Sequence, residues 1–342
     1  MNHQAVGVIA DVSGPELGSS DHELLQHDAL VGVILFARHY QSPQQLLALT
    51  DSIRSVRPEL LICIDQEGGR VQRCRQGFTR LPAMLSFEAP WQQDAEATLV
   101  LVKDAGWLMA TELIACGVDL SFAPVLDIEY GCSQVIGDRA FGHSSESVVA
   151  LAGAWIDGMQ QAGMAATAKH FPGHGAVVAD SHVELPVDSR DIAQLQRDMT
   201  PFAELINAHK LAAVMPAHVT YSAVDPDFSA GFSRQWLQRI LRAQLGFDGI
   251  IFSDDLSMQG AAEAGDYASR SKLAVQAGAQ ALLACNNRDG TLQVLHAVQS
   301  LALPRLDLQP LQATLLRRQQ AQADCDSERA QHTRARLQPL TA

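Results

Sequence analysis

The sequence predicts an α/β fold built as a (β/α)8 TIM barrel, and two observations support this prediction. Eight short apolar runs alternate with amphipathic stretches, which is the pattern of a parallel sheet with crossover helices. Polar side chains also follow nearly every run, as expected at the carboxyl ends of barrel strands. The alternative is an open doubly wound sheet, but that fold needs such groups at only one or two switch points.

The eight apolar runs are the predicted strands. In chain order they cover Val6–Ala10, Val31–Phe36, Leu60–Ile64, Leu120–Val125, Ala165–Ala168, Ala212–Met215, Gly249–Phe252 and Ala281–Ala284. The predicted helices cover Pro43–Val56, Ala95–Cys116, Ser145–Ala162, Ile192–Ala208, Ser233–Leu245, Ala268–Ala277 and Leu292–Leu301. A glycine suited to a helix C-cap follows several of them, as at Gly163 and Gly278. From about Arg317 the chain is polar, and we expect a surface helix that then frays.

Length and composition favour one domain spanning residues 1–342, since no Ser/Gly/Pro-rich linker or tandem repeat divides the chain. A net charge of −13 argues against nucleic acid or an anionic membrane as partner. No leader-like segment or membrane-spanning run is present. The six cysteines form no C-x-x-C motif, so we expect them to be free thiols in a cytoplasmic protein. We also expect the protein to be a monomer.

The segment from Lys169 to His182 is the most unusual part of the chain. Directly after an apolar run it carries three histidines, a lysine, an aspartate, two glycines and a proline. Asp180 precedes His182 by two residues, close enough to orient the imidazole for general acid/base chemistry. The alternative is an Asx-turn beside an incidental surface histidine. Gly173 and Gly175 let the loop move or approach a ligand closely.

Two further segments carry clusters of charged groups that follow predicted strands. The seventh run ends in Asp254 and Asp255, and on an extended segment only one of these carboxylates can face the barrel mouth. The alternative is that one of the aspartates is the N-cap of the next helix, and Asp255 fits this role better than Asp254 does. The second segment, Asp65–Arg73, places acids and two arginines in a glycine-containing turn, and such groups bind vicinal hydroxyls.

Each of these polar groups also has a structural alternative. An internal carboxylate–arginine bridge that orders the loop is as good a reading for Glu67 and Arg70 as contact with a ligand. The Asp138-Arg139 pair, which follows Gly137, is open to interpretation as a surface ion pair.

The sequence gives little support for a metal or a nucleotide cofactor. Four residues that are able to ligate zinc lie in one loop, namely His170, His174, Asp180 and His182, but they lack the H-x-H or H-E-x-x-H spacing. Neither a G-x-G-x-x-G nor a G-x-x-x-x-G-K-[ST] motif is present. We therefore expect no metal and no organic cofactor.

Taken together, four segments resemble glycoside hydrolase family 3, and within it the single-domain bacterial cytosolic β-N-acetylhexosaminidases. These segments are Ile64–Arg73, Gly137–Gly142, Lys169–Gly175 with Asp180–His182, and Phe252–Met258. The resemblance implies a (β/α)8 barrel that removes terminal β-1,4-linked N-acetylglucosamine from muropeptides, including those ending in 1,6-anhydro-N-acetylmuramic acid. It thereby implies a role in peptidoglycan recycling, and hence in cell-wall biogenesis, cell shape and cell division.

The resemblance also implies residue roles. Asp254 would be the nucleophile that forms a covalent glycosyl-enzyme, His182 the general acid/base, and Asp180 the partner that orients His182. The sugar-binding positions would be Asp65, Arg73, Arg139, Lys169 and His170. An imidazole with a pKa near neutrality suits both proton donation and acceptance in a retaining mechanism. Three rivals stay open: a non-catalytic sugar-binding barrel, a metal-dependent amidohydrolase and a phosphorylase.

Overall fold

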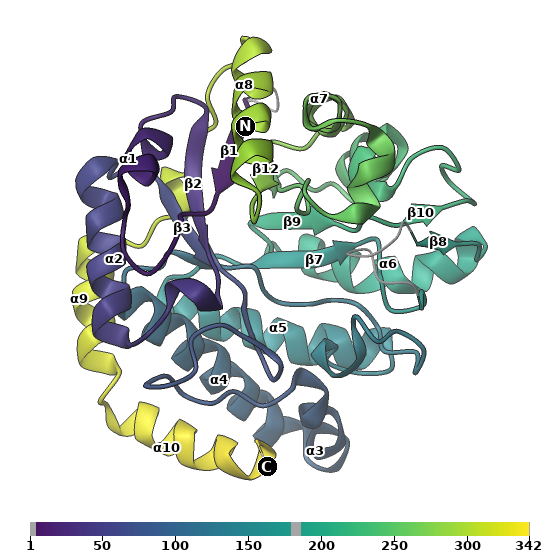
Figure 1. Ribbon diagram of the computed structural model, residues 1–342. Helices are drawn as coiled ribbons and strands as arrows, with labels where there is room; N and C mark the ends of the chain where they lie inside the picture. The colour runs from purple at the N-terminus through teal and green to yellow at the C-terminus, as the bar shows by residue number, and fades with distance from the viewer. Residues whose placement is uncertain (1–4, 179–185, 342) are drawn as a thin grey trace.

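The computed structural model describes residues 5–178 and 186–341, and it has an α/β fold in which helices surround parallel strands (Figure 1). One sheet has the strand order β12-β1-β2-β3-β6 and a second has the order β11-β9-β7, with every pairing parallel. The bounds are β1 (Gly7–Ala10), β2 (Leu30–Leu35), β3 (Leu61–Ile64), β6 (Leu120–Ser121), β7 (Thr167–Phe171), β9 (Ala213–Pro216), β11 (Ile250–Ile251) and β12 (Ala281–Ala284). Isolated parallel bridges join the two sheets at Val125–Lys169 and at Phe252–Ala281.

All eight predicted strands are confirmed in position, although four of them are shorter than predicted: β1 and β3 by one residue, and β6 and β11 by more. The fourth strand, β6, ends at Ser121 rather than at Val125, because Pro124 has no amide hydrogen to donate to a neighbouring strand. Two small pairs of strands were not among those predicted from the sequence. These are the antiparallel pair β4 (Gln66–Gly68) and β5 (Val71–Gln72) and the parallel pair β8 (Val187–Asp188) and β10 (Thr220–Tyr221).

Helices connect successive strands. They are α1 (Ser19–Leu25), α2 (Pro43–Val56), α3 (Glu88–Gln93), α4 (Ala95–Ala115), α5 (Ser145–Ala162), α6 (Ile192–Asn207), α7 (Tyr267–Ala277), α8 (Arg288–Ser300), α9 (Leu315–Asp324) and α10 (Glu328–Leu337). Short helical segments are η1 (Ala37–His39), η2 (Met84–Phe87), η3 (Gly137–Arg139), η4 (Ala230–Phe232), η5 (Gln235–Gln244), η6 (Gln259–Ala264), η7 (Gln309–Leu311) and η8 (Gln338–Leu340). Within the described ranges, none of the helices has the length and apolar character needed to cross a membrane.

Local capping explains why some helix predictions agree with the structure and one does not. The predicted bounds of α5 are confirmed, because the Ser144 hydroxyl accepts from the Ser147 amide at the start and Gly163 takes a φ of 97° at the end. The predicted start of α8 at Leu292 is wrong. The Asn287 side chain accepts from the Gly290 amide and starts the helix at Arg288, so Asn287 is a helix cap.

Two layers of apolar side chains cover the strands on opposite faces. The larger layer lies between strands and helices and includes Val33, Ile62 and Trp155. The smaller layer lies on the other face and takes residues from both sheets. Within it Phe122, just after β6, packs edge-on against Phe252, just after β11, with ring centroids 5.2 Å apart. The inner faces of the two sheets therefore share one core.

The expectation that the polar tail frays is wrong, although its helical character is confirmed. Figure 1 shows α10 running alongside α4 at the end of the chain. Ala330 and Leu337 are fully buried there. Arg329 binds Asp104 at 2.7 Å and its guanidinium lies 4.0 Å from the centre of the Trp107 ring. A few apolar and charged anchors thus hold a mostly polar helix in place.

Candidate active site

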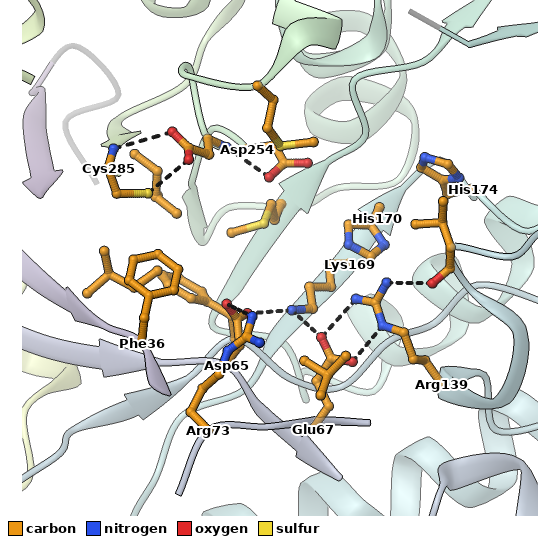
Figure 2. A pocket seen from close by; sticks show the side chains of 18 of the residues that line it. Phe36, Asp65, Glu67, Arg73, Arg139, Lys169, His170, His174, Asp254 and Cys285 are labelled. Carbon is orange, nitrogen blue, oxygen red and sulfur yellow. Dashed lines mark hydrogen bonds and ion pairs between the residues drawn. The ribbon is translucent and has the colours of Figure 1, made fainter. Parts of the chain in front are cut away.

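A cavity of about 450 Å³ lies at the carboxyl ends of the strands. Its lining brings together residues that are far apart in sequence and follow different strands, and Figure 2 shows their side chains converging. Asp65 follows β3, Lys169 and His170 belong to the end of β7, and Asp254 follows β11. Arg73, which follows β5, and Arg139, at the end of η3, also line the cavity. Six of the eight predicted site residues therefore meet in one place.

The other two predicted residues, Asp180 and His182, lie outside the described residues. Their predicted roles as orienting carboxylate and general acid/base accordingly stay predictions. The nearest described part of that loop reaches the cavity, since both His174 and Val178 line it.

Five charged side chains form a network on one side of the cavity. Lys169 Nζ lies 2.8 Å from Asp65 Oδ1 and 2.6 Å from Glu67 Oε1. Arg139 donates twice to Glu67, from Nε and Nη2, each at 2.8 Å. Arg73 reaches Asp65 Oδ2 at 3.4 Å. Two acids and two bases alternate, so the inner network of Asp65, Glu67, Lys169 and Arg139 carries no net charge.

This pairing sets the ionisation of the buried groups. Burial alone would raise the pKa of Glu67, but the positive charges of Arg139 and Lys169 hold it well below its usual value. Burial would lower the pKa of Lys169, yet Asp65 and Glu67 raise it. The cavity therefore offers permanently charged donors and acceptors, and hydrogen bonds to charged groups are about twice as strong as neutral ones.

Asp127 orients His170 from behind the cavity. Its carboxylate lies 2.7 Å from His170 Nδ1 and accepts from the His174 amide at 2.7 Å. Burial would raise the pKa of Asp127, but His170 lowers it. This contact places the His170 ring so that Nε2 is the nitrogen available on its other edge. The chain must pass closely here, because a Cβ on Gly175 would lie 1.8 Å from the Ile128 carbonyl oxygen.

The two adjacent aspartates differ from what an extended segment predicts. Both Asp254 and Asp255 line the cavity, because β11 ends at Ile251 and the aspartates lie in the turn that follows. The Asp255 carboxylate is held by the Ser257 hydroxyl and the Cys285 thiol. Asp255 is also not a helix N-cap, since the next helical segment begins at Gln259 after Met258. The Asp255 amide donates to Asp254 Oδ1 at 2.8 Å.

The structure confirms one of the ion-pair alternatives and corrects the other. Glu67 and Arg70 both make carboxylate–arginine bridges within the protein, although not with each other, and Glu67 binds Arg139 and also Lys169. Arg70 pairs on the surface with Asp138 at 3.1 Å. Arg139 is mostly buried, so the interpretation of Asp138-Arg139 as a surface ion pair is wrong. Adjacent charges on η3 thus serve different partners.

The positioning roles of Glu67 and Asp127 were not predicted from the sequence. Glu67 holds Arg139 and Lys169, and Asp127 holds His170. Asp127 was visible as a polar group after a predicted strand, but its partner His170 is 43 residues away. Among the polar groups that follow the other predicted strands, Asn286 also lines the cavity. Asp11 and Arg38 pair with each other, and His218 is fully buried.

No metal-binding cluster of three or more His, Cys, Asp or Glu side chains occurs among residues 5–178 and 186–341. The six cysteines are all free thiols, as predicted. Cys63 and Cys285 are buried, and Cys285 also lines the cavity.

Comparison with known proteins adds an independent observation. Residues 6–317 match the model of the glycosyl hydrolase family 3 N-terminal domain. The chain is 52% identical over 291 residues to a β-hexosaminidase of Methylococcus capsulatus, covering 85% of this chain and 86% of the relative. A β-hexosaminidase of Tolumonas auensis is 53% identical over 295 residues, with 86% of each chain covered. The crystal structure of NagZ from Neisseria gonorrhoeae in complex with N-trifluoroacetyl-D-glucosamine superposes with a TM-score of 0.90 at 40% identity, covering 99% of both chains.

Proposed function

Since the chain belongs to glycosyl hydrolase family 3 and is a β-N-acetylhexosaminidase, we propose that it acts as a retaining enzyme with Asp254 as nucleophile. One observation supports this role above all. Asp254 lies in the same cavity as the charged network of Asp65, Glu67, Lys169 and Arg139 (Figure 2). A retaining glycosidase requires a carboxylate that attacks the anomeric carbon of the bound sugar and a second group that donates and then accepts a proton. Asp254 would supply the carboxylate, beside the groups that would bind the sugar.

The proposed reaction has two steps. First, an Asp254 oxygen bonds to the anomeric carbon while the bond to the leaving oxygen breaks, and the His182 imidazolium gives that oxygen a proton. Second, neutral His182 takes a proton from water, the water oxygen bonds to the anomeric carbon, and Asp254 departs as a carboxylate. Asp180 orients His182 and stabilises its charged form. No metal or organic cofactor takes part.

The sugar-binding roles are also proposals. Asp65, Lys169, Arg139, Arg73 and His170 would hold the hydroxyl groups of the terminal N-acetylglucosamine. Their support is geometric, because these side chains converge on the cavity with their orientations already set. Glu67 holds Arg139 and Lys169, Asp127 holds His170, and Asp65 is held by Lys169 and Arg73. Preorganised polar groups lower the cost of ordering a bound ligand.

We further propose that the two sheets close into one eight-stranded barrel that forms a single catalytic domain over residues 1–342. The bridges Val125–Lys169 and Phe252–Ala281 link the edges of the sheets on both sides, and Phe122 contacts Phe252 across the shared core. A barrel would place the ends of all eight strands around one mouth, where such enzymes carry their active sites.

For the substrate, we propose muropeptides that carry terminal β-1,4-linked N-acetylglucosamine, including the 1,6-anhydro-N-acetylmuramic acid forms, in peptidoglycan recycling in the cytoplasm. The support is the similarity to β-hexosaminidases and to NagZ bound to an N-acylated glucosamine. We propose that the protein acts as a monomer on this carbohydrate alone.

A chromogenic assay tests the proposal. 4-Nitrophenyl β-N-acetylglucosaminide should be hydrolysed, and the corresponding glucoside should be a much poorer substrate. Asp254→Asn should lower kcat/KM by about 10⁴-fold or more, while the circular dichroism spectrum and Tm stay close to those of the wild type. A folded Asp254→Asn enzyme of near wild-type activity would contradict the assignment. Equal activity with and without a chelator is expected, whereas loss with a chelator would favour the amidohydrolase alternative.

A further inference from the structure

Asp255, which the proposed mechanism does not use, is the meeting point of four hydrogen-bond donors. Ser257 donates to Oδ1 from its amide at 2.9 Å and to Oδ2 from its hydroxyl at 2.7 Å. Cys285 donates to the same two oxygens from its amide at 3.3 Å and from its thiol at 3.0 Å. One carboxylate therefore ties the turn after β11 to the end of β12.

The same turn is joined to β12 at two further points. The Leu283 amide donates to the Ser253 hydroxyl at 2.9 Å, and the Leu256 amide donates to the Leu283 carbonyl at 2.9 Å. Asp254 lies between these two points. The Asp255 amide in turn donates to Asp254 Oδ1 at 2.8 Å, so the peptide that Asp255 holds also orients the neighbouring carboxylate. Figure 2 shows Asp254 and Cys285 on the same side of the cavity.

We propose that Asp255, with Cys285 as its partner, is a positioning residue for the nucleophile Asp254. It fixes the turn on the end of β12, so that the Asp254 carboxylate keeps one orientation toward the anomeric carbon. This inference rests on the proposed role of Asp254. Because reaction rates depend steeply on the approach of the reacting atoms, a displacement of about 1 Å costs about 10²-fold in rate.

If the turn after β11 served stability alone, a second aspartate next to Asp254 would not be needed. Asp255 is largely buried, and burial together with the charge of Asp254 raises its pKa, although Cys285 and Ser257 favour the ionised form. Placing a second carboxylate beside a first is unfavourable. A charged acceptor is the group that can take four donors at once, and this gives the turn a rigidity that a single neutral acceptor would not.

The test uses two pairs of variants of the full-length enzyme. Asp255→Ala removes the acceptor and should lower kcat/KM by about 10²-fold. Asp255→Asn keeps one acceptor oxygen and should lose less. Cys285→Ala removes one of the four donors and should lower kcat/KM by about threefold to tenfold, whereas Cys285→Ser keeps a donor and should recover most of that loss. The matched control is Cys116→Ala, which removes a buried thiol at the end of α4 and should lower Tm without changing kcat/KM.

Two readouts separate positioning from a general structural role. The inhibition constant of N-acetylglucosamine should stay unchanged in the Asp255 and Cys285 variants, because the sugar-binding network is intact. The dependence of kcat/KM on the pKa of an aryl leaving group should also keep its wild-type slope, since proton donation is unaffected. A defect in the general acid would steepen that slope.

Several results would overturn the inference. Folded Asp255→Ala enzyme with kcat/KM within threefold of wild type would do so, as would a loss matched by weaker binding of N-acetylglucosamine. If Asp255→Ala does not fold, the Cys285 pair decides: rescue by serine supports the inference, and equal activity of the two variants contradicts it. Failure of the proposed function is distinguishable, because it appears as activity in Asp254→Asn.

Discussion

At the scale of single residues, the site depends on carboxylates that no substrate needs to touch. Glu67 binds both Arg139 and Lys169 and is almost completely buried. Asp127 is also buried, and it binds His170. These acids fix the direction of the groups proposed to bind sugar, so their loss should affect substrate binding as well as stability.

Glu67→Gln is predicted to impair both properties. It leaves Arg139 and Lys169 buried with less negative charge nearby, and breaking a buried ion pair costs about 3–5 kcal/mol. We expect a lower Tm and a kcat/KM reduced by about 10²-fold, mostly through KM. Glu59→Gln is the matched control, because Glu59 pairs with Arg57 at 2.6 Å at a more exposed place, and it should leave kcat/KM unchanged. Wild-type KM in Glu67→Gln would contradict the role of the network.

The lowered pKa of Glu67 predicts how this stabilisation depends on pH. A carboxyl whose pKa is lower in the folded state stabilises fully above its unfolded pKa of about 4.3, and this stabilisation declines as the pH falls toward the folded value. The Tm difference between wild type and Glu67→Gln should therefore be full above about pH 5 and narrow below about pH 4. Thermal unfolding from pH 3 to pH 7 measures it. If the Tm difference between wild type and Glu67→Gln grew as the pH fell, the pKa of Glu67 would not be lowered in the folded state.

At the scale of elements, the docking of α10 on α4 is a feature of stability and not of catalysis. Arg334 donates to Glu112 at 2.9 Å and to the Thr79 hydroxyl at 2.9 Å. Arg334→Ala should destabilise the protein by about 1 kcal/mol, because the pair is partly exposed and Thr79 still donates to Glu112. Arg336→Ala is the control and should have a smaller effect on Tm. Both variants should keep wild-type kcat/KM in the standard assay, and a large loss in either would mean that the tail reaches the site.

Elements were predictable from the sequence wherever local chemistry decides them. Apolar runs located all eight strands, and caps such as Ser144 and Gly163 defined α5. Predictions failed where distant partners decide. The tail is ordered because Ala330 and Leu337 meet α4, and the pairing of Glu67 with Arg139 joins residues 72 positions apart. The residue types of the site were recognisable, but which carboxylate faces which cation depends on the packing of the strands.

At the scale of the whole molecule, one shared core predicts one cooperative unit. The four tryptophans lie on α3, α4, α5 and η5, and therefore report on different parts of the chain. Thermal unfolding followed by tryptophan fluorescence and by far-ultraviolet circular dichroism should give coincident transitions. Two separated transitions would contradict the proposal of a single domain.

The most direct test of the central claim is to trap the covalent intermediate. A 5-fluoro N-acetylglucosaminyl fluoride should react with the enzyme and remain attached. The ring fluorine slows both the formation and the hydrolysis of the glycosyl-enzyme, whereas the good leaving group at the anomeric carbon speeds only its formation, so the intermediate accumulates. Tandem mass spectrometry of the tryptic peptide spanning residues 243–270 should place the sugar on Asp254. A label on Asp255 or on any other residue, or rapid turnover without a label in an enzyme that needs Asp254, would contradict the account.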